Sequence, residues 1–234
     1  MKNGFDLYNY KNKIEKAIVR VKESSITKKN KSLIFEFIDY CKLENYLNRQ
    51  EIIRIMKLIL IRHGESIANV QEAHSTFEDP LTEEGKSFVS KIKINKNFEK
   101  IYSSDMPRAL DTAKLIFPNQ EIILESRIQE KSNGIFDGML KKDSDWSEVN
   151  KAPFMKRKAE GGESLEDVRK RVISFLSELE DKTYVLVSHG TIMRIIISIA
   201  LRVDLEKVLR TMQIGNGAVL EVIIDKDNLE KIKI

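Results

Sequence analysis

The sequence is organised around one short apolar run that ends in charged and polar residues. Leu58–Ile61 is too short for a helix and consists of strand-forming residues, which predicts a buried β-strand. Arg62, His63 and Gly64 follow it directly. A buried parallel strand that ends in this way delivers polar groups to the carboxyl edge of a sheet, where open α/β sheets bind ligands. Gly64 permits a tight turn and a close approach of the backbone to a bound group.

Two more predicted strands end in a similar way. Tyr184–Ser188 is an apolar run that is followed by His189 and Gly190. The short strand Lys100–Ser103 precedes a helix whose first turn carries Arg108. Because the carboxyl ends of parallel strands meet at one edge of a sheet, we expect the two histidines and the two arginines to surround one anion.

These residue types fit phosphoryl transfer through a phosphohistidine. A neutral imidazole, here that of His63, can attack phosphorus, and nearby cations must then compensate the charge of the transferred group. The planar donor fork of Arg62 and Arg108 suits phosphate oxygens. A nearby cation also disfavours an imidazolium, so we expect Arg62 to help keep His63 neutral.

The motifs resemble those of the histidine phosphatase superfamily, also called the phosphoglycerate mutase-like family, over residues 56–234. The matching segments, in the family's order, are Arg62–Ser66, Asn69, Asp79–Gly85, Ser104–Ala113, Arg127–Glu130, Gly134–Gly138, Gly161–Ser164 and His189. The resemblance implies that His63 is the phosphorylated nucleophile, that His189 is the second catalytic histidine and that Glu130 is the proton donor. The residues that it implies for phosphate binding are Arg62, Asn69, Arg108, His189 and Gly190. It implies no cofactor.

The segment around Glu130 departs from the family pattern at one position. Asp137 stands where the family usually has glutamate. The assignment of Glu130 depends on Arg127 and Gly134, which flank it in the family's order. His74 is interpreted as a surface loop residue.

The distance between the two histidines bears on the choice between hydrolysis and isomerisation. His63 and His189 are 126 positions apart. The family's mutases carry long insertions between these histidines, and this spacing is short by comparison. We therefore expect a phosphomonoesterase that acts on a small phosphorylated metabolite. A cofactor-dependent phosphoglycerate mutase is the alternative within the family.

Apolar runs that alternate with helical patterns predict an α/β fold with three layers, in which helices cover both faces of a mostly parallel sheet. The expected strands are 57–61, 100–103, 121–124, 183–188 and 217–224, and the expected helices are 65–72, 82–95, 107–117, 164–180, 191–201 and 204–211. An irregular stretch is expected from the end of the third strand to about residue 160.

Residues 1–55 are expected to form a small basic helical extension that precedes the phosphatase domain at 56–234. The extension holds 12 Lys and Arg against 7 Asp and Glu. Asn30–Cys41 faintly resembles the core-binding domain of tyrosine recombinases. The simpler interpretation is a helical extension that packs on the phosphatase or mediates a homodimer. The alternative is a nucleic-acid-binding protein with an accessory phosphatase domain, against which the complete catalytic set argues.

Composition indicates a soluble, globular protein of a reducing compartment. Charged residues make up 32% of the chain, and its single cysteine, Cys41, excludes an internal disulfide. No signal peptide is apparent, and Tyr184–Ala200 is too polar to span a membrane, so a cytoplasmic protein without a membrane partner is expected. No H-x-x-x-H or C-x-x-C spacing occurs, and Arg62 would repel a cation beside His63, so no metal is expected.

Overall fold

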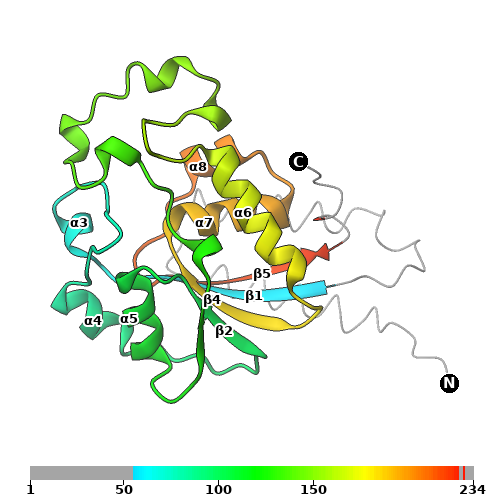
Figure 1. Cartoon of the computed structure of the whole chain (residues 1–234). Coiled ribbons are helices and arrows are strands. Elements are labelled where there is room, and N and C mark those ends of the chain that lie inside the picture. Colours follow the sequence, from blue (N-terminus) through cyan, green and yellow to red (C-terminus); the bar gives the residue numbers. More distant parts are fainter. Residues whose placement is uncertain (1–54, 227–228, 230–234) are drawn as a thin grey trace, which may run out of the picture. The chain divides into compact units, whose positions relative to one another are not determined.

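The computed structural model describes residues 55–226 and residue 229, and its centre is a five-stranded sheet (Figure 1). The strands are β1 (Ile55–Arg62), β2 (Lys100–Ser103), β3 (Ile122–Leu124), β4 (Thr183–Ser188) and β5 (Val219–Asp225). They lie in the order β3-β2-β4-β1-β5. All neighbours are parallel except β1 and β5, which are antiparallel. The predicted α/β class and mostly parallel sheet are confirmed.

Helices cover both faces of this sheet. The helices of the described residues are α3 (Ile67–Val70), α4 (Glu83–Val89), α5 (Pro107–Ile116), α6 (Leu165–Glu178), α7 (Gly190–Leu201) and α8 (Leu205–Thr211), of which all but α3 cover the sheet. In Figure 1, α4 and α5 lie on one side of the strands, and α6, α7 and α8 lie on the other. The sheet is therefore the middle of three layers.

The central strands are apolar on both faces because each face meets a helical layer. In β1, Leu58 and Leu60 pack into the cluster beneath α6, α7 and α8, whereas Ile59 and Ile61 pack into the cluster beneath α4 and α5. Successive side chains of a strand point to opposite faces, so a strand covered on both sides must be apolar at every position. This is why β1 has the continuous apolar run that dominates the sequence.

The register of the sheet brings the strand ends together. Arg62 pairs with Ser188 across β1 and β4, so His63 and His189 are the next residues on two adjacent strands. The backbone N–H of His63 donates to Ser188 O at 2.9 Å. On the other side of β4, Ser103 of β2 pairs with Val187. The polar residues that follow these three strands therefore lie at the same edge of the sheet.

Two predicted helices are shorter than expected. The helix predicted over 82–95 ends at Val89. Ile92 and Ile94 both pack against the cluster beneath α5. Residues two positions apart lie on the same face of an extended segment but on different faces of a helix, so this part of the chain is extended. The helix predicted over 65–72 is the four-residue α3, and Glu72 beyond it has φ of 54°, in the left-handed region that ends helices.

The stretch after β3 is irregular, as expected, and consists of short 3₁₀ turns. These are η1 (Ser126–Ile128), η2 (Gly134–Phe136), η3 (Lys141–Asp143), η4 (Val149–Lys151) and η5 (Phe154–Lys156). At Gly134 this stretch passes very close to the backbone of Glu160. The φ of Gly134 is 60°, and a Cβ there would lie 2.0 Å from Glu160 O, so only glycine fits.

The helical extension predicted for residues 1–55 lies outside the described residues, apart from Ile55. Ile55, the last residue of the predicted helical extension, is instead the first residue of β1. It pairs with Asp225 of β5, which continues the ladder one step before Met56. Across residues 55–226 and 229, no helix combines the length and the apolar character needed to cross a membrane.

Candidate active site

His63 stands directly after β1 and is almost fully buried, with 3% of the residue exposed. Its Nδ1 lies 2.6 Å from the backbone oxygen of Gly64. A carbonyl oxygen only accepts hydrogen bonds, so Nδ1 carries the ring proton and Nε2 keeps a lone pair. The nitrogen that can attack phosphorus is therefore Nε2.

His189 is fully buried beside His63, with 5.1 Å between the two ring centroids. Its Nε2 lies 2.9 Å from Ser104 Oγ, and that oxygen also accepts from the backbone N–H of Met106 at 3.3 Å. When the Ser104 hydroxyl donates to Nε2, a neutral ring carries its proton on Nδ1. That Nδ1 is buried and has no hydrogen-bond partner among the described residues.

Two arginines adjoin the histidine pair. Arg62, at the end of β1, donates from Nη1 to Ile214 O. Arg108, in the first turn of α5, is fully buried and donates from Nη1 to Thr76 O at 2.9 Å. Across the described part of the chain, the Nε–H of each arginine is buried without a partner. Each guanidinium is thus fixed in place and still has a donor to offer.

The electrostatic environment keeps both histidines neutral. Burial is the largest cause that lowers the pKa of His63 well below its ordinary value, followed by the charges of Arg108 and Arg62, against a small opposing effect of the Gly64 hydrogen bond. Burial, then His63 and Arg108, lowers the pKa of His189 in the same direction. Both rings are therefore unprotonated at neutral pH, as nucleophilic attack by His63 requires.

Glu130 lies on the other side of this group of cations. Its Oε2 accepts from the backbone N–H of Thr191 at 3.3 Å, at the start of α7, and its Oε1 accepts from the N–H of Lys131 at 2.9 Å. Burial lowers the pKa of Arg62 and Arg108, and the charge of Glu130 opposes this in both. The carboxyl group is therefore close to the arginines that the sequence assigned to phosphate.

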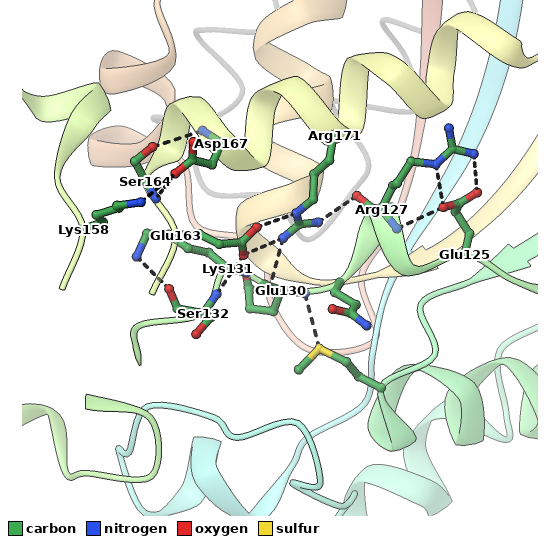
Figure 2. Close-up of polar contacts among 12 residues, drawn as sticks. Glu125, Arg127, Glu130, Lys131, Ser132, Lys158, Glu163, Ser164, Asp167 and Arg171 are labelled. Carbon is green, nitrogen blue, oxygen red and sulfur yellow. Dashed lines mark hydrogen bonds and ion pairs between the residues drawn. The ribbon is translucent and has the colours of Figure 1, made fainter. Parts of the chain in front are cut away.

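The loop that carries Glu130 is held by an arginine from α6, as Figure 2 shows. Arg171 donates to Arg127 O at 2.7 Å and to Glu130 O at 3.3 Å. Glu163 binds the same guanidinium in a bidentate pair, at 2.8 and 2.9 Å. Glu163 also accepts from Ser132 N at 3.1 Å. The backbone is thus anchored on both sides of the Glu130 side chain.

Asn69 and Gly190, which the sequence assigned to phosphate, also lie at this edge of the sheet. Asn69 Oδ1 accepts from Ser66 N at 3.2 Å and from Asn216 Nδ2 at 2.8 Å, which leaves its amide nitrogen as a donor. Gly190 is the first residue of α7, where backbone N–H groups favour anions. A Cβ on Gly190 would lie 3.5 Å from Arg62 Nε.

Sequence reasoning missed Asn216. Its Nδ2 donates to His63 O at 3.3 Å, to Gly64 O at 3.0 Å and to Asn69 Oδ1 at 2.8 Å. One side chain from the turn before β5 therefore holds the backbone beside the nucleophile and orients the Asn69 amide. The available signal was the Gly-Asn-Gly sequence at 215–217, where the last predicted strand begins.

Arg194 was also missed. It lies one turn into α7 and donates from Nε to Gly190 O at 3.0 Å. Its charge adds to burial in lowering the pKa of Arg62, so a third guanidinium stands near the phosphate-binding candidates. The signal in the sequence was a single arginine inside an otherwise apolar helical run.

Two other interpretations from the sequence need comment. His74 is half-buried rather than a surface loop residue, and its ring lies 5.6 Å from that of Trp146 and 6.5 Å from that of Phe136. Asp137, at the unusual motif position, accepts from Ser132 Oγ at 2.8 Å and from Asn133 N at 2.9 Å and so closes a turn. In the part of the chain that the structure describes, no group of His, Cys, Asp or Glu could hold a metal ion.

A cavity of about 410 Å³ opens beside Glu130. Its lining includes Phe77, Met106, Gln129, Glu130, Lys131 and Arg171. Met106 links it to the phosphate side, because its sulfur accepts from Arg108 Nη2 at 3.4 Å and from Glu130 N at 3.3 Å. The site therefore has two parts: a cationic group of strand-end residues around His63, and a mixed polar pocket beyond Glu130.

Comparison with known proteins gives this arrangement a context. Residues 58–233 match the profile of the histidine phosphatase superfamily (branch 1). Among curated proteins, phosphoserine phosphatase 1 of Hydrogenobacter thermophilus is 36% identical over 169 residues, which cover 65% of this chain and 80% of that protein. The 2,3-bisphosphoglycerate-dependent phosphoglycerate mutase of Bartonella bacilliformis is 28% identical over 199 residues, which cover 74% and 96%.

Solved structures agree on the fold. The crystal structure of TTHB049 from Thermus thermophilus superposes with a TM-score of 0.60 and 28% identity, over 71% of this chain and 93% of that one. A mycobacterial glucosyl-3-phosphoglycerate phosphatase superposes with a TM-score of 0.60 and 22% identity, over 73% and 91%. At that lower identity, the second likeness concerns the fold alone.

Proposed function

The chain belongs to the histidine phosphatase superfamily, and we propose that it is a metal-independent phosphomonoesterase that acts on a small phosphorylated metabolite through a phosphohistidine on His63. The alternative within the family is a cofactor-dependent phosphoglycerate mutase. A small phosphorylated substrate is the partner proposed for residues 55–226. Binding of nucleic acid or a second copy through residues 1–55, and a cytoplasmic location, remain predictions from the sequence.

One observation carries the proposal. Three buried nitrogens next to His63 have no hydrogen-bond partner among the described residues, namely Nε of Arg62, Nε of Arg108 and Nδ1 of His189. A buried donor left unsatisfied costs about 1–3 kcal/mol, so native proteins keep few of them. A phosphoryl group is a compact anion with several acceptor oxygens, and it would satisfy all three together.

The first step transfers the phosphoryl group to the protein. Nε2 of His63 attacks phosphorus, and the bond from phosphorus to the alcohol oxygen breaks. Glu130, in its protonated form, gives its proton to that leaving oxygen. Arg62, Arg108 and His189 stabilise the negative charge on the equatorial oxygens in a buried site, where such interactions are strong.

The second step restores the enzyme. Water attacks the phosphohistidine after the alcohol has left, and Glu130, now a carboxylate, takes a proton from that water. The bond from phosphorus to Nε2 breaks, which regenerates the neutral ring of His63 and releases phosphate. The hydrogen bond from Nδ1 to Gly64 O keeps the same ring nitrogen directed at phosphorus in both steps.

Two observations favour hydrolysis over isomerisation. The spacing of 126 positions between His63 and His189 is short for the family's mutases. The matched relative named as a phosphoserine phosphatase is 36% identical, against 28% for the matched phosphoglycerate mutase.

The test is turnover of a substrate panel in EDTA by the native protein and by His63→Ala. The panel holds p-nitrophenyl phosphate, phosphoserine, sugar phosphates, nucleotides, and 3-phosphoglycerate with its bisphosphate primer. We expect phosphate release that survives EDTA, and a loss of about 10⁴-fold or more in His63→Ala. Isomerisation of 3-phosphoglycerate without phosphate release would establish the mutase instead.

A trapping experiment tests the intermediate itself. Substrate labelled on phosphorus and quenched in denaturant should leave label on the native protein, stable in alkali and lost in acid, as a phosphoramidate is. Glu130→Gln should retain this label or accumulate it, because its second step lacks a base. Label on His63→Ala would contradict the assignment of the nucleophile.

A further inference from the structure

Asn216 lies in the loop between α8 and β5, and one atom of its side chain meets three oxygens of the phosphate side. Its Nδ2 is 2.8 Å from Asn69 Oδ1, 3.0 Å from Gly64 O and 3.3 Å from His63 O. All three are carbonyl oxygens, which only accept, so the atom that faces them is the amide nitrogen and not the amide oxygen. The two hydrogens of this nitrogen serve three acceptors, so at least one is shared.

The carbonyl of Gly64 links Asn216 to the nucleophile. It accepts from His63 Nδ1 at 2.6 Å and from Asn216 Nδ2 at 3.0 Å. The hydrogen bond from the ring keeps the proton on Nδ1 and leaves the lone pair of Nε2 for the attack on phosphorus. Asn216 is the second donor to this carbonyl, so its amide is coupled to the tautomer of His63.

The amide of Asn69 is oriented by the same atom. Asn69 Oδ1 accepts from Asn216 Nδ2 at 2.8 Å and from Ser66 N at 3.2 Å. The amide of Asn69 cannot turn over without setting its own NH₂ group against both donors. Its NH₂ group is therefore kept on the opposite side, where it can donate to a phosphoryl oxygen.

The backbone that carries Asn216 follows a constrained course. Gly217 has φ of 68°, which glycine adopts without strain, and a Cβ there would lie 2.5 Å from a ring carbon of Phe88. The N–H of Gly217 donates to His63 O at 3.1 Å. The loop is thus tied to the nucleophile by its backbone as well as by the half-buried side chain of Asn216.

We propose that Asn216 is a positioning residue for phosphoryl transfer: its amide selects the attacking nitrogen of His63 and directs the amide donor of Asn69 toward the phosphoryl group. The proposal rests on the proposed phosphatase function and deepens it. Asn216 acts only through these neighbours and touches neither the substrate nor the reacting atoms. Because both roles use one nitrogen, a change of this amide should disturb the nucleophile and phosphate binding together.

The first test reads the tautomer of His63 by nitrogen-15 NMR and needs no turnover. The chain has three histidines, so labelling of histidine gives few signals. We expect the native His63 ring to carry its proton on Nδ1. In Asn216→Asp, a carboxylate faces Gly64 O in place of a donor, and a measurable share of the ring proton should move to Nε2. A native ring protonated on Nε2, or an unchanged tautomer in the variant, would overturn the proposal.

The second test measures binding of inorganic phosphate by titration calorimetry, again without turnover. In the native background, Asn69→Ala should weaken binding about tenfold, the range of one hydrogen bond to a charged group. In the background of Asn216→Leu, which has a similar size and no donor, the same change should cost less than about threefold, because the Asn69 amide is no longer directed. Equal costs in the two backgrounds would contradict the coupling.

The third test compares kcat of the two variants as a function of pH. At pH 7.5 both should lose about 10- to 100-fold, for aryl and alkyl phosphates alike, because the nucleophile is misplaced. The three acceptor oxygens raise the pKa of the carboxyl introduced in Asn216→Asp, and its protonated form regains one donor. Its deficit relative to the native protein should therefore shrink between pH 8 and pH 5, while that of Asn216→Leu should not. Parallel profiles would argue against a role through the donor.

Controls separate positioning from general stability. Asn119→Asp makes the same chemical change at an exposed position of the turn after α5, and it should leave all three measurements unchanged. The signals of His74 serve as an internal reference, and a change there as large as at His63 would indicate general loosening and overturn the proposal. A native protein that hydrolyses no phosphomonoester would refute the phosphatase function, whereas the first two tests would still decide whether Asn216 orients its neighbours.

Discussion

The two halves of the site are built in opposite ways. The phosphate side consists of residues that follow β1, β2 and β4, positioned by the register of a buried sheet. The pocket side consists of 3₁₀ turns and loops between 125 and 163, positioned by side chains that bind backbone atoms (Figure 2). Among the described residues, the phosphate side keeps three buried donors without a partner, whereas Arg127 and Arg171 of the pocket side are paired with carboxylates.

This difference separates two tasks. Strand ends in a close-packed sheet are rigid, so they can hold unsatisfied donors that a flexible segment would turn toward its own backbone. Loops held by ion pairs and hydrogen bonds can vary in sequence without disturbing the sheet. We infer that the phosphate side determines whether any phosphomonoester reacts, and that the pocket side determines which one.

Arg108→Gln tests whether the phosphate side is indifferent to the alcohol. We expect kcat/KM to fall about 10³-fold on every substrate, aryl and alkyl alike, because a fixed cation that meets the phosphoryl oxygens is removed. Arg108→Lys keeps the charge without the planar fork, so its kcat/KM should lie between those of the native protein and Arg108→Gln. The measurement is the ratio of the losses for p-nitrophenyl phosphate and an alkyl phosphate, and a tenfold difference between them would break the separation of tasks.

Glu130→Gln tests the boundary between the two sides. An alkoxide is a poor leaving group and needs a proton, whereas p-nitrophenolate leaves without one. We therefore expect a loss of about 10²-fold for alkyl phosphates and less than about tenfold for p-nitrophenyl phosphate. Steady-state rates over a series of leaving groups would measure this, and equal slowing throughout would argue against Glu130 as the acid.

Arg171→Leu tests whether the loop anchor positions that acid. Without its hydrogen bonds to Arg127 O and Glu130 O, the Glu130 carboxyl should be held less firmly. We expect about a tenfold loss for alkyl phosphates and little change for p-nitrophenyl phosphate, a weaker form of the Glu130→Gln pattern. Arg171→Lys should recover part of the loss.

A matched control addresses general destabilisation, since Arg171→Leu also leaves Glu163 without its cation. Arg127→Leu removes a neighbouring arginine that pairs with Glu125 and Glu178 and bonds no part of Glu130. It should lower thermal stability without changing the dependence on leaving group. The same leaving-group pattern in both variants would show that the anchor has no special role.

The smallest effect concerns stability and pH. As pH falls below about 6.5, unfolded imidazoles take up protons, whereas His63 and His189 in the folded protein have lowered pKa values and do not. The unfolded state then binds more protons than the folded state. The free energy of unfolding therefore decreases as the pH is lowered, by up to about 1.4 kcal/mol per pH unit for each ring. Urea unfolding between pH 7.5 and 5 should show a shallower decline in a His63→Asn, His189→Asn double variant. Parallel declines would mean that these rings are not held neutral.

The phosphate side was predictable from the sequence because it depends on strand ends. Apolar runs fix the strands, and the parallel pairing of β1 and β4 then places His63 beside His189 without further information. Asn216 escaped prediction because its hydrogen bonds join residues about 150 positions apart, and a Gly-Asn-Gly turn alone shows only that the chain reverses.

The pocket side was predictable only as irregular. Its geometry depends on pairs such as Arg171 with Glu163 and Lys131 with Asn133, which no hydrophobic period encodes. The early end of α4 has a similar cause: contacts of Ile92 and Ile94 with a distant part of the core override local helical preference.

The place of β1 in the sheet has a consequence for synthesis on the ribosome. β1 is the first described strand to emerge, yet its neighbours in the sheet are β4 and β5, which emerge more than a hundred residues later. Until then its apolar run has no strand to pair with, which makes it a natural binding segment for chaperones. Asn216, which holds the backbone beside His63, emerges later still. A nascent chain therefore contains His63 long before the site around it can form.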